Sequence, residues 1–183
     1  MKKVAAKLLT VLRRRREYVR FWEWPDARTK ERAIAEELTA SLGGRGGPSL
    51  FGLRYPAQSP PDIVARDADG RDVGIEVAQL APRETAWQHG YGQPVFRRWT
   101  AREVISTVEE RIREADRKKV HGGPYAELLL LILTNEPKIC YDDYAEALSE
   151  HLFAETRQLT RVYVLFSYDH AERGYRCVEL KTR

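Results

Sequence analysis

The chain has 183 residues, of which 43% are hydrophobic and 32% are charged, a mixture typical of a globular domain rather than a disordered chain. Its longest apolar run is far too short to cross a bilayer. Two cysteines exclude both a disulfide scaffold and a thiolate zinc cluster. We therefore expect a cytoplasmic protein with no membrane span.

The net charge of +4 is unevenly distributed along the chain. The first twenty residues hold eight Lys or Arg and one acid, a net charge of +7, so the other 163 residues carry −3. Apolar residues at helical spacing predict a basic amphipathic helix over residues 3–20. Such a segment suits binding to phosphates or to an anionic membrane surface, while a solvated helix and a mitochondrial presequence are alternative interpretations. We assign residues 1–24 to a helical extension and 25–183 to one α/β domain.

Hydrophobic periodicity and turn residues predict the remaining elements in chain order: a helix over 25–42, strands over 50–55, 62–67 and 71–80, a helix over 101–119, a strand over 127–134, a helix that begins at Asp143, and strands over 161–168 and 175–181. A glycine-rich linker at 43–48 and a long loop over 81–97 separate some of them. Thr100 and Glu103 form a capping box before the second of these helices. The order predicts an α/β fold with a mixed central sheet flanked by helices.

The hairpin between the second and third predicted strands brings two acids together. Asp69-Gly70 is a turn signal, and the loop length determines the register of the strands. A three-residue loop over 68–70 places the apolar residues of both strands on one face and makes Asp62 the cross-strand neighbour of Glu76. A two-residue loop would pair Asp62 with Val77 and divide the apolar residues between the faces, which a half-buried sheet disfavours.

Asp62 and Glu76 would repel each other in the favoured register, because like charges on opposed strand residues are destabilising. A divalent cation between them would remove this repulsion, and carboxylate oxygens are the ligands that magnesium prefers. Gly74 and Ala78 flank Glu76 on its face, and their small size predicts room for a ligand. The alternative interpretation is that both acids decorate a solvated face.

The segments Pro61-Asp62 and Gly74-Ile75-Glu76-Val77 resemble the core motif of the PD-(D/E)XK nuclease superfamily. The predicted element order is also similar to the restriction-endonuclease-like core of that superfamily (αβββαβ), here with an added C-terminal helix and strands. The third strand resembles the "IEVTEL" strand of uncharacterised nuclease-like proteins. Glu31 lies on the apolar stripe of the first helix of this core and resembles the glutamate that this helix often carries, although a first-turn glutamate favoured by the helix dipole is the alternative.

The resemblance implies hydrolysis of phosphodiester bonds in nucleic acid, DNA rather than RNA. It also implies a Mg²⁺ or Mn²⁺ site formed by Glu31, Asp62 and Glu76 with the backbone carbonyl of Val77. The metal would activate water and stabilise the developing negative charge.

The superfamily's lysine should stand two residues after Glu76, but Ala78 occupies that position. Gln79 is one substitute, although strand alternation sends it to the opposite face unless a bulge intervenes. Lys119 is the other, because it falls on the buried stripe of the predicted helix; a lysine that reaches solvent at a helix C-terminus is the alternative. Asp62, Glu76 and Lys119 are therefore the candidate catalytic residues.

Three functional hypotheses follow. The first is a metal-dependent endonuclease. The second is an inactive nuclease-fold protein that binds or regulates, which the missing lysine and the slightly acidic body favour. The third is a phosphate- or membrane-docking module driven by the basic N-terminal segment, whose binding to phosphates should weaken steeply as salt rises.

Overall fold

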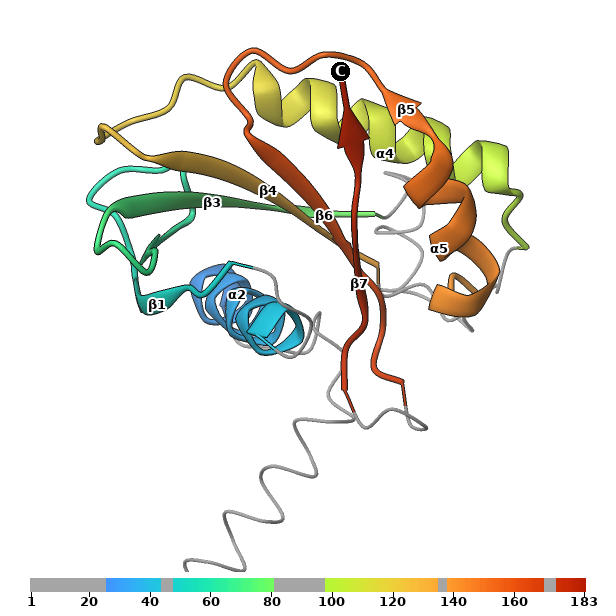
Figure 1. The fold of residues 1–183 in the computed structure, drawn as a ribbon, viewed down its shortest axis with the longest axis horizontal. Coiled ribbons are helices and arrows are strands. Elements are labelled where there is room, and N and C mark those ends of the chain that lie inside the picture. Colours follow the sequence, from blue (N-terminus) through green and yellow to red (C-terminus); the bar gives the residue numbers. More distant parts are fainter. Residues whose placement is uncertain (1–25, 44–47, 81–97, 135–137, 170–173) are drawn as a thin grey trace, which may run out of the picture.

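The computed structural model describes residues 26–43, 48–80, 98–134, 138–169 and 174–183, whose main feature is a mixed six-stranded sheet (Figure 1). The predicted helix over 3–20 and the predicted loop over 81–97 lie outside these residues, as does most of the glycine linker. The described elements are α2 (Ala27–Gly43), β1 (Phe51–Arg54), β2 (Ile63–Arg66), β3 (Asp72–Gln79), α4 (Ala101–Asp116), β4 (Glu127–Leu133), α5 (Tyr141–Glu150), β5 (Leu152–Phe153), β6 (Arg161–Leu165), β7 (Cys177–Glu179) and β8 (Lys181–Thr182).

The strand order of the main sheet is β1-β2-β3-β4-β6-β7. Strands β3, β4 and β6 run parallel to one another, while β1, β2 and β7 pair antiparallel with their neighbours. Six of the seven residues of β4 are buried, as expected for a central strand that is covered on both faces. The mixed α/β fold class is therefore confirmed. None of the helices in the described ranges has both the length and the apolar character needed to span a bilayer.

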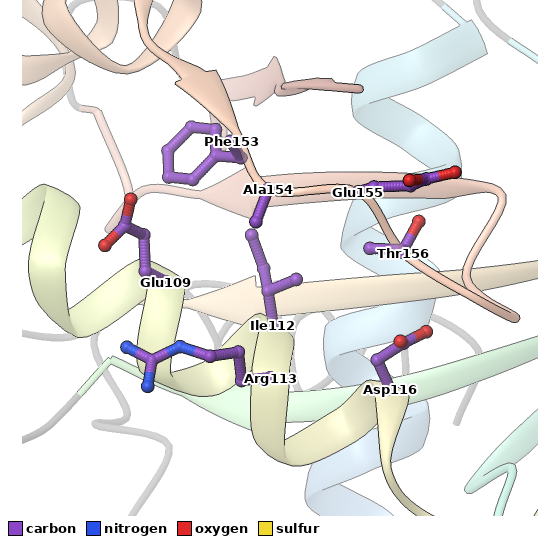
Figure 2. Close-up of a pocket in the computed structure, with 8 residues that line it drawn as sticks. All are labelled: Glu109, Ile112, Arg113, Asp116, Phe153, Ala154, Glu155 and Thr156. Carbon is purple, nitrogen blue, oxygen red and sulfur yellow. The ribbon is translucent and has the colours of Figure 1, made fainter.

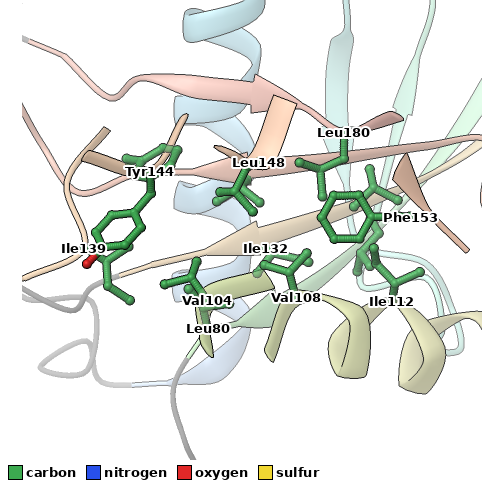
Figure 3. Close-up of a cluster of buried hydrophobic side chains, with 14 of the residues drawn as sticks. Leu80, Val104, Val108, Ile112, Ile132, Ile139, Tyr144, Leu148, Phe153 and Leu180 are labelled. Carbon is green, nitrogen blue, oxygen red and sulfur yellow. The ribbon is translucent and has the colours of Figure 1, made fainter. Parts of the chain in front are cut away.

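The two faces of the sheet bury separate apolar clusters. Helix α2 covers one face, and α4 with α5 covers the other (Figure 1). Figure 3 shows the second cluster, in which Val104, Val108 and Ile112 of α4 lie near Ile132 of β4 and Leu148 of α5. These α4 residues recur at helical spacing and are nearly inaccessible to solvent, so burial of one helix stripe explains the packing.

The predicted capping box of Thr100 and Glu103 is confirmed at the start of α4, but several boundaries were wrong. Helix α4 ends at Asp116 rather than at residue 119. Helix α5 has Cys140 as its N-cap, so Asp143 lies in its first turn, where the helix dipole favours an acid. The last predicted strand is divided into two strands. Its first part, β7, pairs with β6, and its second part, β8, pairs with β5, a short strand that the sequence did not indicate.

The hairpin of β2 and β3 has the predicted register. Ile63 pairs with Ile75, and Gly70 has φ 78°, the left-handed conformation that the three-residue loop requires. Regular pairing ends at Ile63, and the N–H of Asp62, the residue before β2, donates to the Ile75 carbonyl. The Asp62 carboxyl group is still close enough to Glu76 to raise the pKa of Glu76, so the two acids lie near each other at the point where β2 begins.

The space expected beside Glu76 is filled at Gly74. A Cβ atom on Gly74 would lie 2.8 Å from Leu128 Cδ1 and 3.1 Å from Pro61 Cγ. Leu128 is the residue of β4 that pairs with Gly74, so the parallel neighbour strand places its side chain there. The expectation of room for a ligand on this side was wrong, and Gly74 is required by close packing.

We expect Gly74→Ala to lower the free energy of unfolding by about 1 kcal/mol, because the added methyl group overpacks a site where both Leu128 and Pro61 would have to shift. Urea denaturation measures the change. Gly43→Ala is the matched control, since a Cβ atom at Gly43 meets nothing within 4 Å. Equal stability of the two variants would contradict the packing argument.

Candidate functional site

Asp62 lies one residue before β2, where backbone pairing with β3 ends. Its N–H donates to the Ile75 carbonyl at 3.1 Å, and its Oδ2 accepts from the Val77 N–H at 2.9 Å. Its Oδ1 accepts from the Ser59 hydroxyl at 3.0 Å. The Asp62 carboxylate thus accepts the hydrogen bond from Val77 that a backbone carbonyl would accept if the pairing of β2 with β3 continued. Because the N–H and C=O of one strand residue point to the same edge, the Val77 carbonyl faces this edge too.

Glu76 is the only acid among the buried residues of the described chain, with 3% of its surface exposed. Its Oε1 accepts a hydrogen bond from the ammonium group of Lys118, whereas its Oε2 is buried and receives none. Burial raises the pKa of Glu76, the bond from Lys118 lowers it, and the neighbouring Asp62 carboxyl raises it again, so the net pKa lies above its ordinary value. A positive charge is therefore favoured next to this carboxylate.

Lys118, which sequence reasoning missed, supplies that charge. It lies two residues beyond the end of α4 and donates to Glu76 from a half-exposed position. Burial lowers the pKa of Lys118, but the bond to Glu76 and the nearby Asp62 outweigh this effect and raise it, so the ammonium stays protonated. The His121 N–H donates to the Pro60 carbonyl at 2.8 Å, which ties the segment after Lys118 to the segment before Asp62.

The two predicted substitutes for the motif lysine differ in outcome: Lys119 is misplaced, whereas Gln79 lies where strand alternation puts it. Lys119 is exposed and lies beyond α4, so its predicted position on a buried helix stripe was wrong. The pairing of β3 with β4 is continuous through Gln79, without a bulge, so strand alternation keeps Gln79 on the face opposite Glu76. The sequence signal for the lysine at this site was the adjacent pair Lys118 and Lys119. Choosing between the two required knowing where α4 ends.

Glu31 approaches the same acids from α2. It is partly buried, and its pKa is raised to about 7, first by burial and then by the charges of Asp62 and Glu76. Its carboxyl group is therefore electrostatically coupled to both strand acids. Three mutually repelling carboxyl groups destabilise the folded protein unless a cation or a proton offsets them.

We expect Glu31→Gln to stabilise the metal-free protein by about 1 kcal/mol at pH 8 and to change nothing at pH 4. A folded-state pKa of about 7 against 4.5 means that the wild type loses stability as pH rises through this interval. The expected gain includes a reduction for solvent screening of a partly exposed group. Urea denaturation in EDTA across this pH range measures it.

Glu36→Gln on the same helix is the control, because the Glu36 side chain forms an exposed ion pair with Arg32. Its effect should be small and destabilising, as expected for an exposed i,i+4 pair. A pH-independent effect of Glu31→Gln would contradict the coupling of Glu31 to the two strand acids.

The acids match the donor chemistry of a magnesium site without forming a complete one. Within the described ranges, no group of three or more His, Cys, Asp or Glu residues is arranged to hold a metal ion. Asp62 and Glu76 nevertheless offer hard oxygen donors, and the buried Glu76 Oε2 has no hydrogen-bond donor. Mg²⁺ commonly binds through one or two carboxylates and completes its shell with water and substrate phosphate. The residues therefore fit such an ion.

Comparison with protein-family models, curated proteins and solved structures finds no match to this chain. The geometry of the site is therefore the basis for assigning a function.

A separate cavity of about 250 Å³ lies between α4 and residues 153–156 (Figure 2). Its lining does not include the acids or the lysine described above. Two of its own carboxylates are already bonded, since Glu109 contacts His151 at 3.2 Å and Asp116 accepts backbone N–H groups. The cavity is therefore a weaker candidate for catalysis than the site around Glu76.

Proposed function

We propose that this chain is a metal-dependent nuclease that hydrolyses phosphodiester bonds of nucleic acid, with Asp62, Glu76 and Lys118 as its catalytic residues. One observation carries the proposal: Glu76 is buried between a second carboxyl group and an ammonium group from a different element. Apolar residues at such a position would generally give equal or greater stability. Perturbed pKa values in a cluster of this kind favour a functional role over a structural one.

The resemblance to the PD-(D/E)XK superfamily supports the same proposal. The order of a helix, three strands, a helix and a strand is similar to that of the restriction-endonuclease-like core. In this proposal Asp62 and Glu76 would correspond to the two motif acids. We assign the role of the motif lysine to Lys118, whose ammonium group reaches Glu76 from the end of α4 instead of from β3.

Each residue has a distinct role in the proposed reaction. Asp62 and Glu76 would hold Mg²⁺ or Mn²⁺ with the Val77 carbonyl, and Glu31 would contribute directly or through water. A bound ion of this kind lowers the pKa of a water molecule and polarises the scissile phosphate. The Val77 N–H fixes the orientation of the Asp62 carboxylate. Lys118 would orient the attacking water or donate to a phosphate oxygen.

The test is cleavage of supercoiled DNA and of several RNAs in Mg²⁺, Mn²⁺ or EDTA, with DNA as the favoured substrate. We expect cleavage that EDTA and Asp62→Asn both abolish. Asp69→Asn makes the same chemical change in the exposed turn of the same hairpin and should cleave like the wild type. Cleavage that persists in EDTA or in Asp62→Asn would contradict the proposed site.

The alternative is an inactive nuclease-fold protein that binds or regulates. One observation favours it: the Lys118 ammonium group compensates the buried charge of Glu76. This alternative predicts nucleic-acid binding without cleavage and a melting temperature that Mg²⁺ and Mn²⁺ do not change. The nuclease proposal predicts a higher melting temperature in metal than in EDTA, because an ion bound only by the folded state stabilises it.

A further inference from the structure

The end of α4 is attached to a loop about forty residues away in the sequence. The Asp116 carboxylate accepts the backbone N–H groups of Arg157, Gln158 and Leu159 at 3.0–3.3 Å. An acid at a helix C-terminus is disfavoured by the helix dipole, so it needs a compensating contact. Burial alone would raise the pKa of Asp116, but these three bonds outweigh burial and lower it.

The side chain of Gln158 makes the second attachment. Its Nε2 donates to the Asp116 carbonyl at 2.6 Å and to the Lys118 carbonyl at 2.8 Å. Both hydrogens of the amide are therefore used. Carbonyl groups at the C-terminal end of a helix lack N–H donors within the helix, so donors from elsewhere determine the path of the chain there. The Lys118 N–H donates in turn to the Ala115 carbonyl at 3.1 Å.

This attachment matters because two lysines are adjacent at the turn. Lys118 reaches Glu76, whereas Lys119 is exposed to solvent. A small rotation of the backbone would change which ammonium group faces the carboxylate. Asp116 and Thr156 both line the cavity of Figure 2, so side-chain packing between α4 and the loop is incomplete there. Hydrogen bonds therefore contribute to holding the turn in place.

We propose that Gln158 is a positioning residue that holds Lys118, rather than Lys119, on Glu76. The catalytic part of this inference depends on the proposed nuclease function, whereas the positioning itself does not. Gln158→Met approximately keeps the side-chain volume and removes both donors. Gln158→Glu places a carboxylate against two carbonyl groups. Each variant keeps the backbone N–H groups that donate to the Asp116 carboxylate, so the loop remains attached to the end of α4.

The experiment is competitive acetylation of the folded, full-length chain, with Lys118 and Lys119 resolved in one peptide by fragmentation mass spectrometry. In the wild type we expect Lys118 to react about tenfold more slowly than Lys119, because a hydrogen bond to a buried carboxylate protects its ammonium group. In both Gln158 variants the two rates should become nearly equal. An unchanged ratio in the Gln158 variants would overturn the inference.

Thr156→Val is the matched control, because Thr156 donates only within the same loop, to the Leu159 carbonyl at 2.7 Å. It should keep the wild-type labelling ratio even if it lowers the melting temperature. A Thr156→Val ratio that shifts as far as that of Gln158→Met would show general loosening of the loop and would overturn a specific role for Gln158.

Cleavage assays separate this inference from the proposed function. If the chain is a nuclease, Gln158→Met should lower kcat about 10-fold to 100-fold with little change in KM, because a displaced lysine is less effective in the transition state. It should cause no further loss in a Lys118→Met background. Absence of any cleavage by the wild type would refute the nuclease, while the labelling ratio would still decide whether Gln158 positions Lys118.

Discussion

Lys118→Met should lower the rate constant for nucleic-acid cleavage by about 10²- to 10⁴-fold, the range expected when a positioned proton-transfer or charge-stabilising group is removed. Lys118 is the residue whose ammonium group bonds to Glu76, and its pKa is raised, so it carries its charge at neutral pH. Methionine has a similar length but no charge. Single-turnover cleavage of the substrate identified for the wild type, at saturating Mg²⁺, measures the change.

Lys119→Met is the matched control for this prediction. It removes the same charge from the next residue, which is exposed and lies beyond the end of α4. Its kcat should remain within about twofold of the wild type, since surface charges away from the site act mainly on association. If Lys119→Met were the inactive variant and Lys118→Met the active one, our assignment of the catalytic lysine would be wrong.

Lys118→Met should also lower the free energy of unfolding by about 1–2 kcal/mol at pH 8 in EDTA. The substitution leaves Glu76, which is 3% exposed, without its ion-pair partner. Breaking a fully buried pair costs about 3–5 kcal/mol, and we reduce this range because Lys118 is half exposed. Urea denaturation of the wild type and the variant measures the loss.

The loss should depend on pH in a defined direction. The pKa of Glu76 lies above its ordinary value in the folded protein, and removing Lys118 raises it further. As pH falls through that raised value the folded variant takes up a proton, and below the ordinary value of 4.5 Glu76 is neutral in both folded and unfolded states. The destabilisation seen at pH 8 should therefore shrink towards pH 4.

A double-mutant cycle completes this prediction. In a Glu76→Gln background, Lys118→Met should cost less than about 0.5 kcal/mol, because no buried charge is left without a partner. An equal cost in both backgrounds, or a cost that does not change with pH, would show that Lys118 stabilises the protein through packing of its side chain and not through its charge on Glu76.

The sequence by itself determined the hairpin that carries the two acids. The Asp69-Gly70 turn and the period of two in the flanking strands leave one register that keeps the apolar residues on one face. The structure has this register, with Ile63 opposite Ile75. Information of this kind lies within about fifteen consecutive residues, so no distant contact is needed to interpret it.

The apolar patterns also predicted the mixed α/β fold and the central position of β4, since burial on both faces leaves no polar residue between Leu128 and Leu133. They did not indicate β5, a strand of two residues whose partner β8 lies about thirty residues further along the chain. Nor did they show that Leu128 fills the space at Gly74, because this contact depends on how two parallel strands align across a long connection.

The identity of the lysine was decided only by the tertiary structure. Helical arithmetic carried through residue 119 favoured Lys119, but α4 ends three residues earlier. That end coincides with bonds from Asp116 to a loop about forty residues away and with the amide of Gln158. Local propensity cannot register such contacts, because their donors become neighbours of the helix only after the sheet has brought β4 and β6 together. The strand acids were predictable from adjacent residues, whereas the cation that faces them depended on the folded chain.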